Sequence, residues 1–505
     1  MEFGQKVFTR NYLLLLAIVL VGLFLRVYNL GANNLWLDEA IAVYIAKLGL
    51  SQFAQAQPAI ELNPPLYFVI LHYWAILFGD SEFAVRFLSV VFGVLAIPMI
   101  YVVGRQLFDE EAGLVGALIL ALSSFNVQFS QEARMYSLML LLTLLSMFFF
   151  ARFLRKSNLS ISGGYILVTT LLLYTHVFGL FVVVAQNIYV LALLFLRREN
   201  PFPLRRWIAF QAIILALFAP WIRILISHIS TVQGGFWVPL PTLGTFLHTF
   251  VLYGGNGVLL VIFVALSVCS LFTYTNARGS TDRKGPLKAL QDYLRNVHIT
   301  NTESVMFLVV WLLTVNVIPF VISRFSTPIY LEKYAIAASV AFYLLAAGGL
   351  RNINWRYVKL AVVAVIVILS AVNLHQYYTY NTKANAQEPF NVVINNAQSG
   401  DVVIVFPGYV KFIFDYYGRG TNANVTPFPA ADYYSMSWEN KNTAENIKEL
   451  QSDVNGHDRV WFVSATGHGS AALLIQAKKA LDESYDTRSS QSYPGYDVLL
   501  YEKRA

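Results

Sequence analysis

Long hydrophobic stretches separated by short polar segments fill the chain as far as Leu374. A membrane-spanning helix needs roughly 20 mostly apolar residues, and about eleven stretches reach or approach that length. We expect spans at 11–30, 84–103, 112–127, 136–153, 165–175, 180–196, 207–227, 257–275, 304–323, 334–350 and 358–374. The pattern predicts a polytopic α-helical membrane protein, in which 112–127 and 165–175 are short for spans.

The stretch 64–79 is apolar but differs from the spans. It opens with Pro64-Pro65, carries His72 and is shorter than a full crossing, so we expect a helix that lies in the membrane interface. If it does not cross and the N-terminus is cytoplasmic, nearly all short loops obey the positive-inside rule. The external segments are then 31–83, 128–135, the turn at His176, 228–256 and 324–333, and together they hold most polar residues of chemical interest.

After Leu374 the composition becomes polar. Residues 381–505 contain strand-like runs at 402–406, 460–463 and 498–501 and helix-like runs around 444–450 and 471–481. We therefore expect two parts: a transmembrane domain over residues 1–380, whose first external loop 31–83 carries juxtamembrane helices, and an external α/β domain over 381–505. The segment Gly467-His468-Gly469-Ser470 between a strand and a helix is interpreted as a plain turn, although a phosphate-binding loop has a similar pattern.

Composition supports the membrane assignment and limits the partners. The 505 residues are 57% hydrophobic, 15% aromatic and 13% charged, more apolar surface than one soluble core hides. The formal net charge is +7, but the basic residues lie mostly in short loops where they set topology, so no nucleic-acid partner is expected. Cys269 is the single cysteine, which excludes an intrachain disulfide.

The segment Trp36-Leu37-Asp38-Glu39, just after the first span, is the strongest candidate for chemistry. Carboxylates at the mouth of a membrane helix are costly to desolvate and belong where water or a polar substrate reaches them. One carboxylate would serve as a general base. The alternative is structural, with Asp38 as the N-cap of an interfacial helix that begins there.

Four other external segments carry candidate site residues. Their polar members are Asn63 before Pro64-Pro65, Glu132, Arg134 and Tyr136 at the outer end of a span, His176 between two spans, and Arg324, Glu332 and Lys333 in a late turn. Each has a structural alternative: a helix start, a helix-capping ion pair, a hydrogen-bonded histidine and snorkelling cations. A phosphate headgroup would explain the cations of the late turn better.

These segments, in this order, resemble the C-type glycosyltransferase superfamily. The motifs are Trp36-Leu37-Asp38-Glu39, Asn63-Pro64-Pro65-Leu66, 81–89, 132–136 and Thr175-His176, and the branch contains the protein O-mannosyltransferases and the lipid A aminoarabinose transferases. The resemblance covers roughly residues 11–350. Two departures stand out: Asn63 replaces the family's common His or Lys, and Lys333 replaces an Arg, which loses bidentate geometry.

The resemblance implies an inverting transferase that takes a sugar from dolichyl or undecaprenyl phosphate. Asp38 would be the base, Glu39 and Glu132 would orient groups, and Arg324, Lys333 and Arg134 would bind the donor phosphate. Asn63, His176 and Tyr136 would contact substrate. Metal use stays open, with Asp38, Glu132 and His176 as candidate ligands of a divalent cation. The acceptor is a protein, lipid or polysaccharide hydroxyl on the outer face of a prokaryotic plasma membrane, such as the cell inner membrane.

Three other functions remain alternatives. A transferase or ligase of whole glycans from a lipid pyrophosphate would need more cationic groups than Arg324 and Lys333 supply. A sugar or lipid transporter should have polar residues at mid-membrane and repeat symmetry, whereas Arg223 near one end is the exception among nearly uncharged spans. A receptor would explain the external domain but not the acidic loop.

Overall fold

The structure is a computed structural model that describes residues 2–156, 158–196, 202–233, 238–274, 297–299, 301–380, 386–419, 421, 423–431 and 443–504. The chain forms two compact units. Unit 1 comprises Met1–Tyr28, Phe87–Ile222 and Val238–Tyr380, and unit 2 comprises Asn29–Arg86, Arg223–Trp237 and Asn381–Ala505. The loop 31–83 therefore belongs to the same unit as the C-terminal segment.

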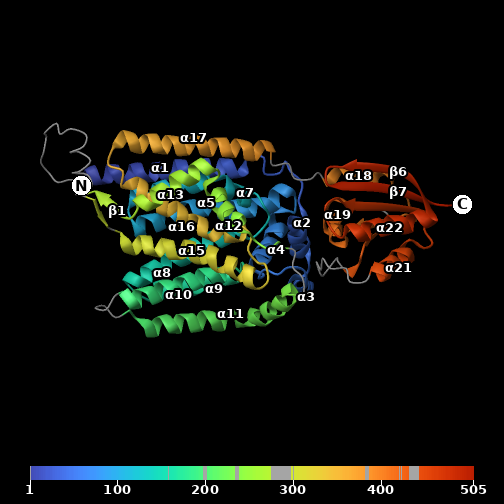
Figure 1. Cartoon of the computed structure of the whole chain (residues 1–505), viewed down its shortest axis with the longest axis horizontal. Helices are drawn as coiled ribbons and strands as arrows, with labels where there is room; N and C mark the ends of the chain where they lie inside the picture. Colours follow the sequence, from blue (N-terminus) through green and yellow to red (C-terminus); the bar gives the residue numbers. More distant parts are fainter. Residues whose placement is uncertain are drawn as a thin grey trace. The chain divides into compact units, whose positions relative to one another are not determined.

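The described residues include eight helices that are long and apolar enough to cross a membrane. They are α1 (Glu2–Val27), α5 (Glu82–Leu107), α8 (Tyr136–Arg155), α10 (Gly179–Leu196), α11 (Leu204–Gln233), α15 (Thr302–Phe325), α16 (Ser339–Arg351) with the preceding 3-10 turn η1 (Tyr334–Ala338), and α17 (Arg356–Tyr380). Each matches a predicted span (Figure 1). The short predicted span at 165–175 corresponds to α9 (Leu159–Leu173), which is also shorter than a full crossing.

Two further apolar segments are bent pairs of helices. The predicted span 112–127 is α6 (Glu110–Leu122) followed by α7 (Ser124–Ser130), bent by 62°. Ser123 causes the break, because its side chain accepts from the Asn126 N–H and so caps a new helix. Likewise α12 (Leu243–Gly254) turns by 86° into α13 (Gly257–Cys269), where Gly255 adopts φ +90° and Asn256 caps α13.

The prediction for this second bent pair was partly wrong. The expected span 257–275 ends at Cys269, and the strand β1 (Phe272–Tyr274) follows and pairs with β2 (Val297–Ile299). The helix α12 was not predicted, because twelve residues are too few for a membrane span.

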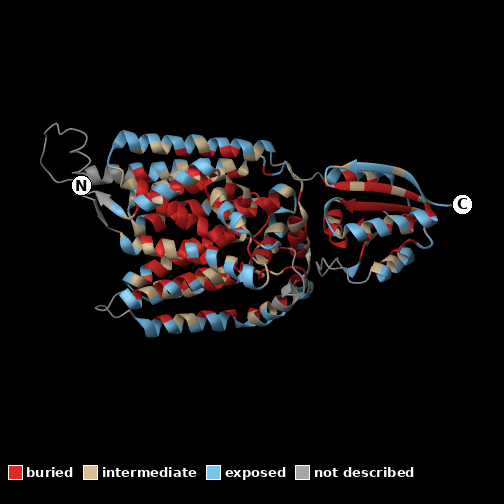
Figure 2. Ribbon diagram, viewed as in Figure 1, coloured by how far each residue is buried: buried red, intermediate tan, exposed pale blue. Residues whose placement is uncertain are grey.

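Burial separates central from peripheral helices in unit 1. In Tyr334–Arg351, 89% of the residues are buried, and α16 packs against α6, α13 and α15. In contrast, 22% of the residues in the most apolar stretch of α17 are buried, and many of its exposed side chains are apolar, as at Leu360 and Ile368. Figure 2 shows the same division, with buried residues along α16 and exposed residues along α17. An exposed face this apolar is suited to lipid rather than water.

The loop 31–83 forms three helices of unit 2: α2 (Leu37–Lys47), α3 (Leu50–Ile60) and α4 (Leu66–Phe78). The helix expected after Asp38 is α2, which buries Ile41 and Ile45 on one face. The expected helix after Pro64-Pro65 is α4, which begins at Leu66 as proline favours. Its residues Tyr73, Ile76, Leu77 and Phe78 are exposed and apolar.

The C-terminal part of unit 2 is an α/β domain, as predicted. Its elements are α18 (Gln387–Asn396), β3 (Val402–Phe406), η2 (Gly408–Val410), α19 (Lys411–Tyr417), β4 (Asn424–Pro427), α21 (Thr443–Val454), β5 (Arg459–Ala465), α22 (Ala471–Ser484), β6 (Tyr485–Tyr493) and β7 (Tyr496–Lys503). The sheet order is β4-β3-β5-β7-β6, with β3 parallel to β4 and β5, and β7 antiparallel to β5 and β6. The core includes Ile404, Phe462 and Leu473.

Candidate functional site

The segment Trp36-Leu37-Asp38-Glu39 of unit 2, which we call the acidic loop, is built around a buried ion pair. Glu39 is fully buried, and its two carboxylate oxygens accept from Nε and Nη2 of Arg86, each at 2.8 Å. Arg86 also donates to the backbone carbonyls of Leu30 (3.0 Å), Asn33 (2.6 Å) and Asn34 (2.9 Å). One guanidinium group thus holds both Glu39 and the turn that precedes it, in the bidentate geometry that arginine provides.

Asp38 lies in the first turn of α2, next to this ion pair. Trp36 occupies the N-cap position, and its backbone N–H donates to Oε2 of Glu39 at 3.3 Å. Asp38 is therefore not the N-cap, and the structural alternative for it is wrong. Its carboxylate is half-buried, whereas that of Glu39 is fully engaged by Arg86. Of the two, Asp38 has the exposure that a base needs to meet a substrate.

Asn63 fixes the turn between α3 and α4. Its backbone N–H and its Nδ2 both donate to Oε1 of Glu61, at 3.1 and 2.8 Å, and its carbonyl accepts from Gln57. Asn63 and Glu61 are both buried. Sequence reasoning missed Glu61 as a buried carboxylate of unit 2, although a charged residue two positions before Asn63-Pro64-Pro65 was a signal for it.

The segment with Glu132, Arg134 and Tyr136 belongs to unit 1 and is buried throughout. Arg26, a fully buried residue of α1, donates to Ser130 Oγ at 3.2 Å and to the carbonyls of Leu120 and Ala121 at the end of α6. These carbonyls lack helical partners at the bend, which is why a buried cation is stable there. Sequence reasoning missed this role of Arg26.

Further contacts hold the same segment. The Gln131 side chain donates to the carbonyls of Arg26 and Tyr28 and accepts from the Tyr377 hydroxyl at 2.8 Å. Ser89 donates to the carbonyl of Arg134 at 3.1 Å. The backbone around Glu132 and Arg134 is thus attached to three helices of unit 1.

His176 is the centre of a second cluster, which we call the cationic cluster and which comprises Arg134, Tyr136, His176, Lys333 and Tyr334. The ring of His176 lies 6.0 Å from that of Tyr136 and 5.2 Å from that of Tyr334. The Lys333 ammonium lies 5.8 Å from the Tyr136 ring and 5.7 Å from the Tyr334 ring. The packing of α8 against η1 brings these side chains together.

The protonation of His176 follows from its surroundings. Burial, with the nearby charges of Arg134 and Lys333, lowers the pKa of His176 to about 3. The neutral ring accepts from the Phe178 N–H at Nδ1 (3.0 Å), so the proton is assigned to Nε2. Among the described residues, buried Nε2 has no hydrogen-bond partner. The cationic cluster therefore holds a neutral N–H donor beside two cations, a set that suits an anion.

The same surroundings bear on metal binding. The described residues contain no group of three or more His, Cys, Asp or Glu side chains that could hold a metal ion. His176 lies close to two positive charges, so it does not fit the role of a cation ligand. Asp38 belongs to unit 2 and Glu132 and His176 to unit 1.

Arg324 also belongs to unit 1. It is exposed at the end of α15 and donates to the carbonyl of Pro241 at 3.4 Å. The turn that carries Lys333 is held differently, because the N–H groups of Ile329 and Tyr330 both donate to Ser323 Oγ at 2.9 Å. Neighbouring Glu332 lies 3.7 Å from His248.

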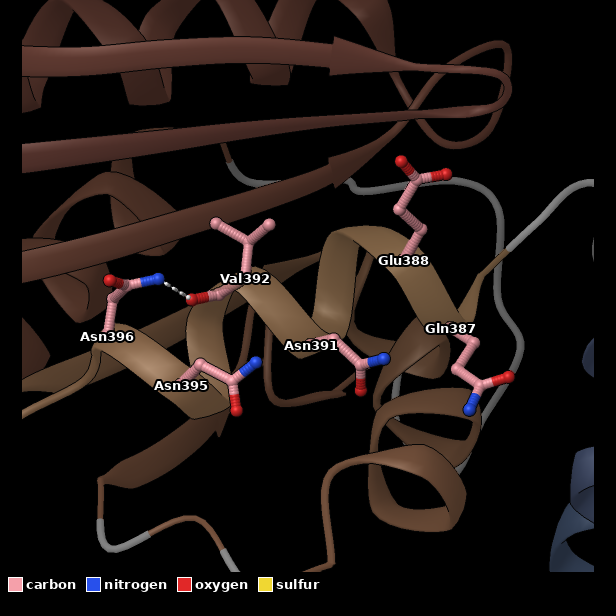
Figure 3. Close-up of a pocket in the computed structure, with 6 residues that line it drawn as sticks. All are labelled: Gln387, Glu388, Asn391, Val392, Asn395 and Asn396. Atoms are coloured by element: carbon pink, nitrogen blue, oxygen red, sulfur yellow. Dashed lines mark hydrogen bonds between the residues drawn. The ribbon is translucent and has the colours of Figure 1, made fainter.

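An open hollow of about 530 Å³ also lies on the C-terminal domain. Its lining residues are Gln387, Glu388, Asn391, Val392, Asn395 and Asn396. In Figure 3 all six come from the single helix α18, and the hollow is a helix face rather than an enclosed site. None of the predicted site residues lines it.

Comparison with known proteins agrees with this architecture. The sequence pattern of the family described as dolichyl-phosphate-mannose-protein mannosyltransferase matches residues 62–224. No curated protein sequence matches the chain.

Solved structures match over nearly the full length. ArnT from Cupriavidus metallidurans in the apo state has 12% sequence identity and a TM-score of 0.61, covering 98% of both chains. The same ArnT bound to undecaprenyl phosphate has a TM-score of 0.56 at 12% identity, covering 97% of both chains. The Archaeoglobus fulgidus oligosaccharyltransferase tethered with an acceptor peptide has a TM-score of 0.54 at 12% identity, covering 98% of this chain and 74% of that one. The chain has the C-type glycosyltransferase fold, and its resemblance to the branch with protein O-mannosyltransferases and ArnT is confirmed.

Proposed function

We propose that the protein is an integral-membrane, inverting glycosyltransferase that moves a sugar from a polyprenyl-phosphate donor to an acceptor hydroxyl. The cationic cluster is the observation that carries this proposal. A buried, neutral histidine donor beside Arg134 and Lys333 suits the phosphate of a lipid-linked sugar. ArnT was solved with undecaprenyl phosphate and an archaeal oligosaccharyltransferase with dolichol-phosphate, which supports a lipid phosphate as the ligand.

In the proposed reaction, Asp38 takes the proton of the acceptor hydroxyl as that oxygen attacks the anomeric carbon. The bond between this carbon and the lipid phosphate breaks, and the phosphate keeps the electron pair. Its charge changes from about −1 in the diester to about −2 in the released monoester. Lys333, Arg134 and the His176 N–H stabilise this added charge, which favours the transition state over the ground state.

The other predicted residues have supporting roles in this proposal. Glu39 orients the loop through Arg86, and Asn63 shapes the turn before α4. Glu132, between the buried anchors Ser130 and Arg134, orients the phosphate-binding segment. Arg324 is assigned to the membrane interface, where it attracts the anionic donor. The site faces the outside of a prokaryotic plasma membrane, with a protein, lipid or polysaccharide as acceptor.

The test uses purified full-length protein in lipid with a series of polyprenyl-phosphate sugars, and measures release of the free lipid phosphate. Wild-type protein should release it, and Asp38→Asn should lower turnover at least about a hundredfold, the effect of losing a general base. Asp486→Asn removes a carboxylate from the exposed strand β6 and should leave turnover unchanged. Equal turnover by wild type and Asp38→Asn would exclude Asp38 as the base. Passage of the intact donor across the bilayer without turnover would favour a transporter.

A further inference from the structure

Within unit 2, α19 and the nearby Arg419 of the C-terminal domain contact α2 and the loop before α5. Tyr416 donates to the carbonyl of Asp80 at 2.9 Å, and Arg419 lies 2.8 Å from the Asp80 carboxylate. On the preceding turn, the Phe412 ring meets the Tyr44 ring of α2 edge-on at 4.9 Å. Side chains from one short helix thus contact both the α2 face and the loop before α5.

Tyr417 contacts the chain three residues before Asp38. Its hydroxyl accepts from the Leu35 N–H at 2.7 Å and donates to Oε1 of Glu82 at 3.1 Å. Leu35 precedes the cap residue Trp36, and Glu82 lies one turn before Arg86 on α5. A single hydroxyl therefore connects the backbone at the entry to α2 with the start of α5.

The loop is consequently held from two sides. Arg86 binds the carbonyls of Leu30, Asn33 and Asn34, and Tyr417 binds the next N–H along the chain, at Leu35. Burial raises the pKa of the Tyr417 hydroxyl well above its usual value, so the hydroxyl keeps its proton and remains the donor to Glu82. A phenylalanine fills the same space but makes neither bond.

We propose that the C-terminal domain is a positioning element of the active site, in which the Tyr417 hydroxyl fixes the Leu35 backbone and thereby the direction of the Asp38 carboxylate. This inference rests on the proposed function for its kinetic consequence. Tyr417 acts through the loop and is a positioning residue, not a catalytic one. Catalytic groups tolerate little displacement, since an error of about 1 Å can cost a hundredfold in rate.

The experiment compares full-length Tyr417→Phe with Tyr493→Phe, a matched loss of a hydroxyl in the same domain, where Tyr493 contacts the Gln491 side chain on β6. Two quantities are measured. Hydrogen exchange reports on the Leu35 amide, and steady-state release of lipid phosphate from the polyprenyl-phosphate sugar gives kcat and KM.

In Tyr417→Phe the Leu35 amide should exchange up to about tenfold faster, as loss of one hydrogen bond allows. In the same variant kcat should fall at least about tenfold, with donor KM and undecaprenyl phosphate affinity within about twofold of wild type. Tyr493→Phe should match wild type in both measurements. Unchanged Leu35 exchange in Tyr417→Phe, or faster exchange with unchanged kcat, overturns the inference. A wild-type protein without turnover refutes the proposed function instead, and the Leu35 exchange then still tests the contact itself.

Discussion

Removing either partner of the Glu39–Arg86 pair should destabilise unit 2 strongly, and by different amounts. The two side chains are 0% and 2% exposed, and breaking such a buried pair costs about 3–5 kcal/mol because one charge is left uncompensated. In Glu39→Gln the guanidinium keeps its bonds to the carbonyls of Leu30, Asn33 and Asn34. The loss of stability in Glu39→Gln should therefore be near the lower end of this range, about 3 kcal/mol.

Arg86→Met should cost more, because it removes the charge partner of Glu39 and the donors of three carbonyls together. Each carbonyl left unsatisfied adds about 1 kcal/mol or more, so we expect a loss of about 5 kcal/mol or above. The double variant Glu39→Gln/Arg86→Met should be less destabilised than the sum of the single variants by about 2 kcal/mol, since the two residues are directly coupled.

The assay is equilibrium unfolding of the full-length protein in mixed micelles with increasing denaturing detergent. Arg488→Met is the control, because Arg488 pairs with Glu502 at 2.7 Å but the two side chains are 63% and 37% exposed, and such pairs contribute less than about 1 kcal/mol. A Glu39→Gln variant as stable as the control would refute the role of this pair in holding the acidic loop.

Two further predictions concern the cationic cluster. Lys333→Met should weaken binding of undecaprenyl phosphate about tenfold by loss of a charge-assisted contact, while Arg324→Met, at the exposed end of α15, should change it less than about threefold; equal losses in a binding titration would contradict this division. Because the folded-state pKa of His176 is about 3 and its ordinary value 6.5, acidification from pH 6.5 towards 3 protonates the unfolded chain first. Protonation of His176 in the unfolded chain should therefore lower the free energy of unfolding by up to about 1.4 kcal/mol for each unit that the pH falls. His176→Gln should flatten this slope, and an unchanged slope would show that His176 is not held neutral.

Much of the fold could be predicted from hydropathy, and the breaks within it could not. Each expected span corresponds to a helix, because apolar length is enough to identify one. The bends at Ser123 and Gly255-Asn256 depend on single capping residues inside apolar stretches, which a hydropathy pattern averages away. The strand β6 was missed for another reason: its run Thr487 to Ser492 is polar, and it is a strand because it pairs with β7.

The candidate site was predictable in its residue types but not in its pairing. Asp38, His176 and Lys333 were chosen as candidates because polar groups beside apolar spans need a reason. The partner of Glu39 was not found, since Arg86 lies 47 positions away and pairing at such separation depends on the fold. Arg324 and Lys333 were grouped by proximity in sequence; in the structure Arg324 is exposed and donates to the carbonyl of Pro241, and the turn before Lys333 is held by Ser323 Oγ.

A structure determined with a bound polyprenyl-phosphate sugar would test whether His176 and Lys333 bind the donor phosphate. We expect a phosphate oxygen within hydrogen-bonding distance, about 2.7–3.2 Å, of His176 Nε2 and of the Lys333 ammonium. A lipid phosphate bound at another site, with His176 Nε2 contacting protein groups instead, would contradict it.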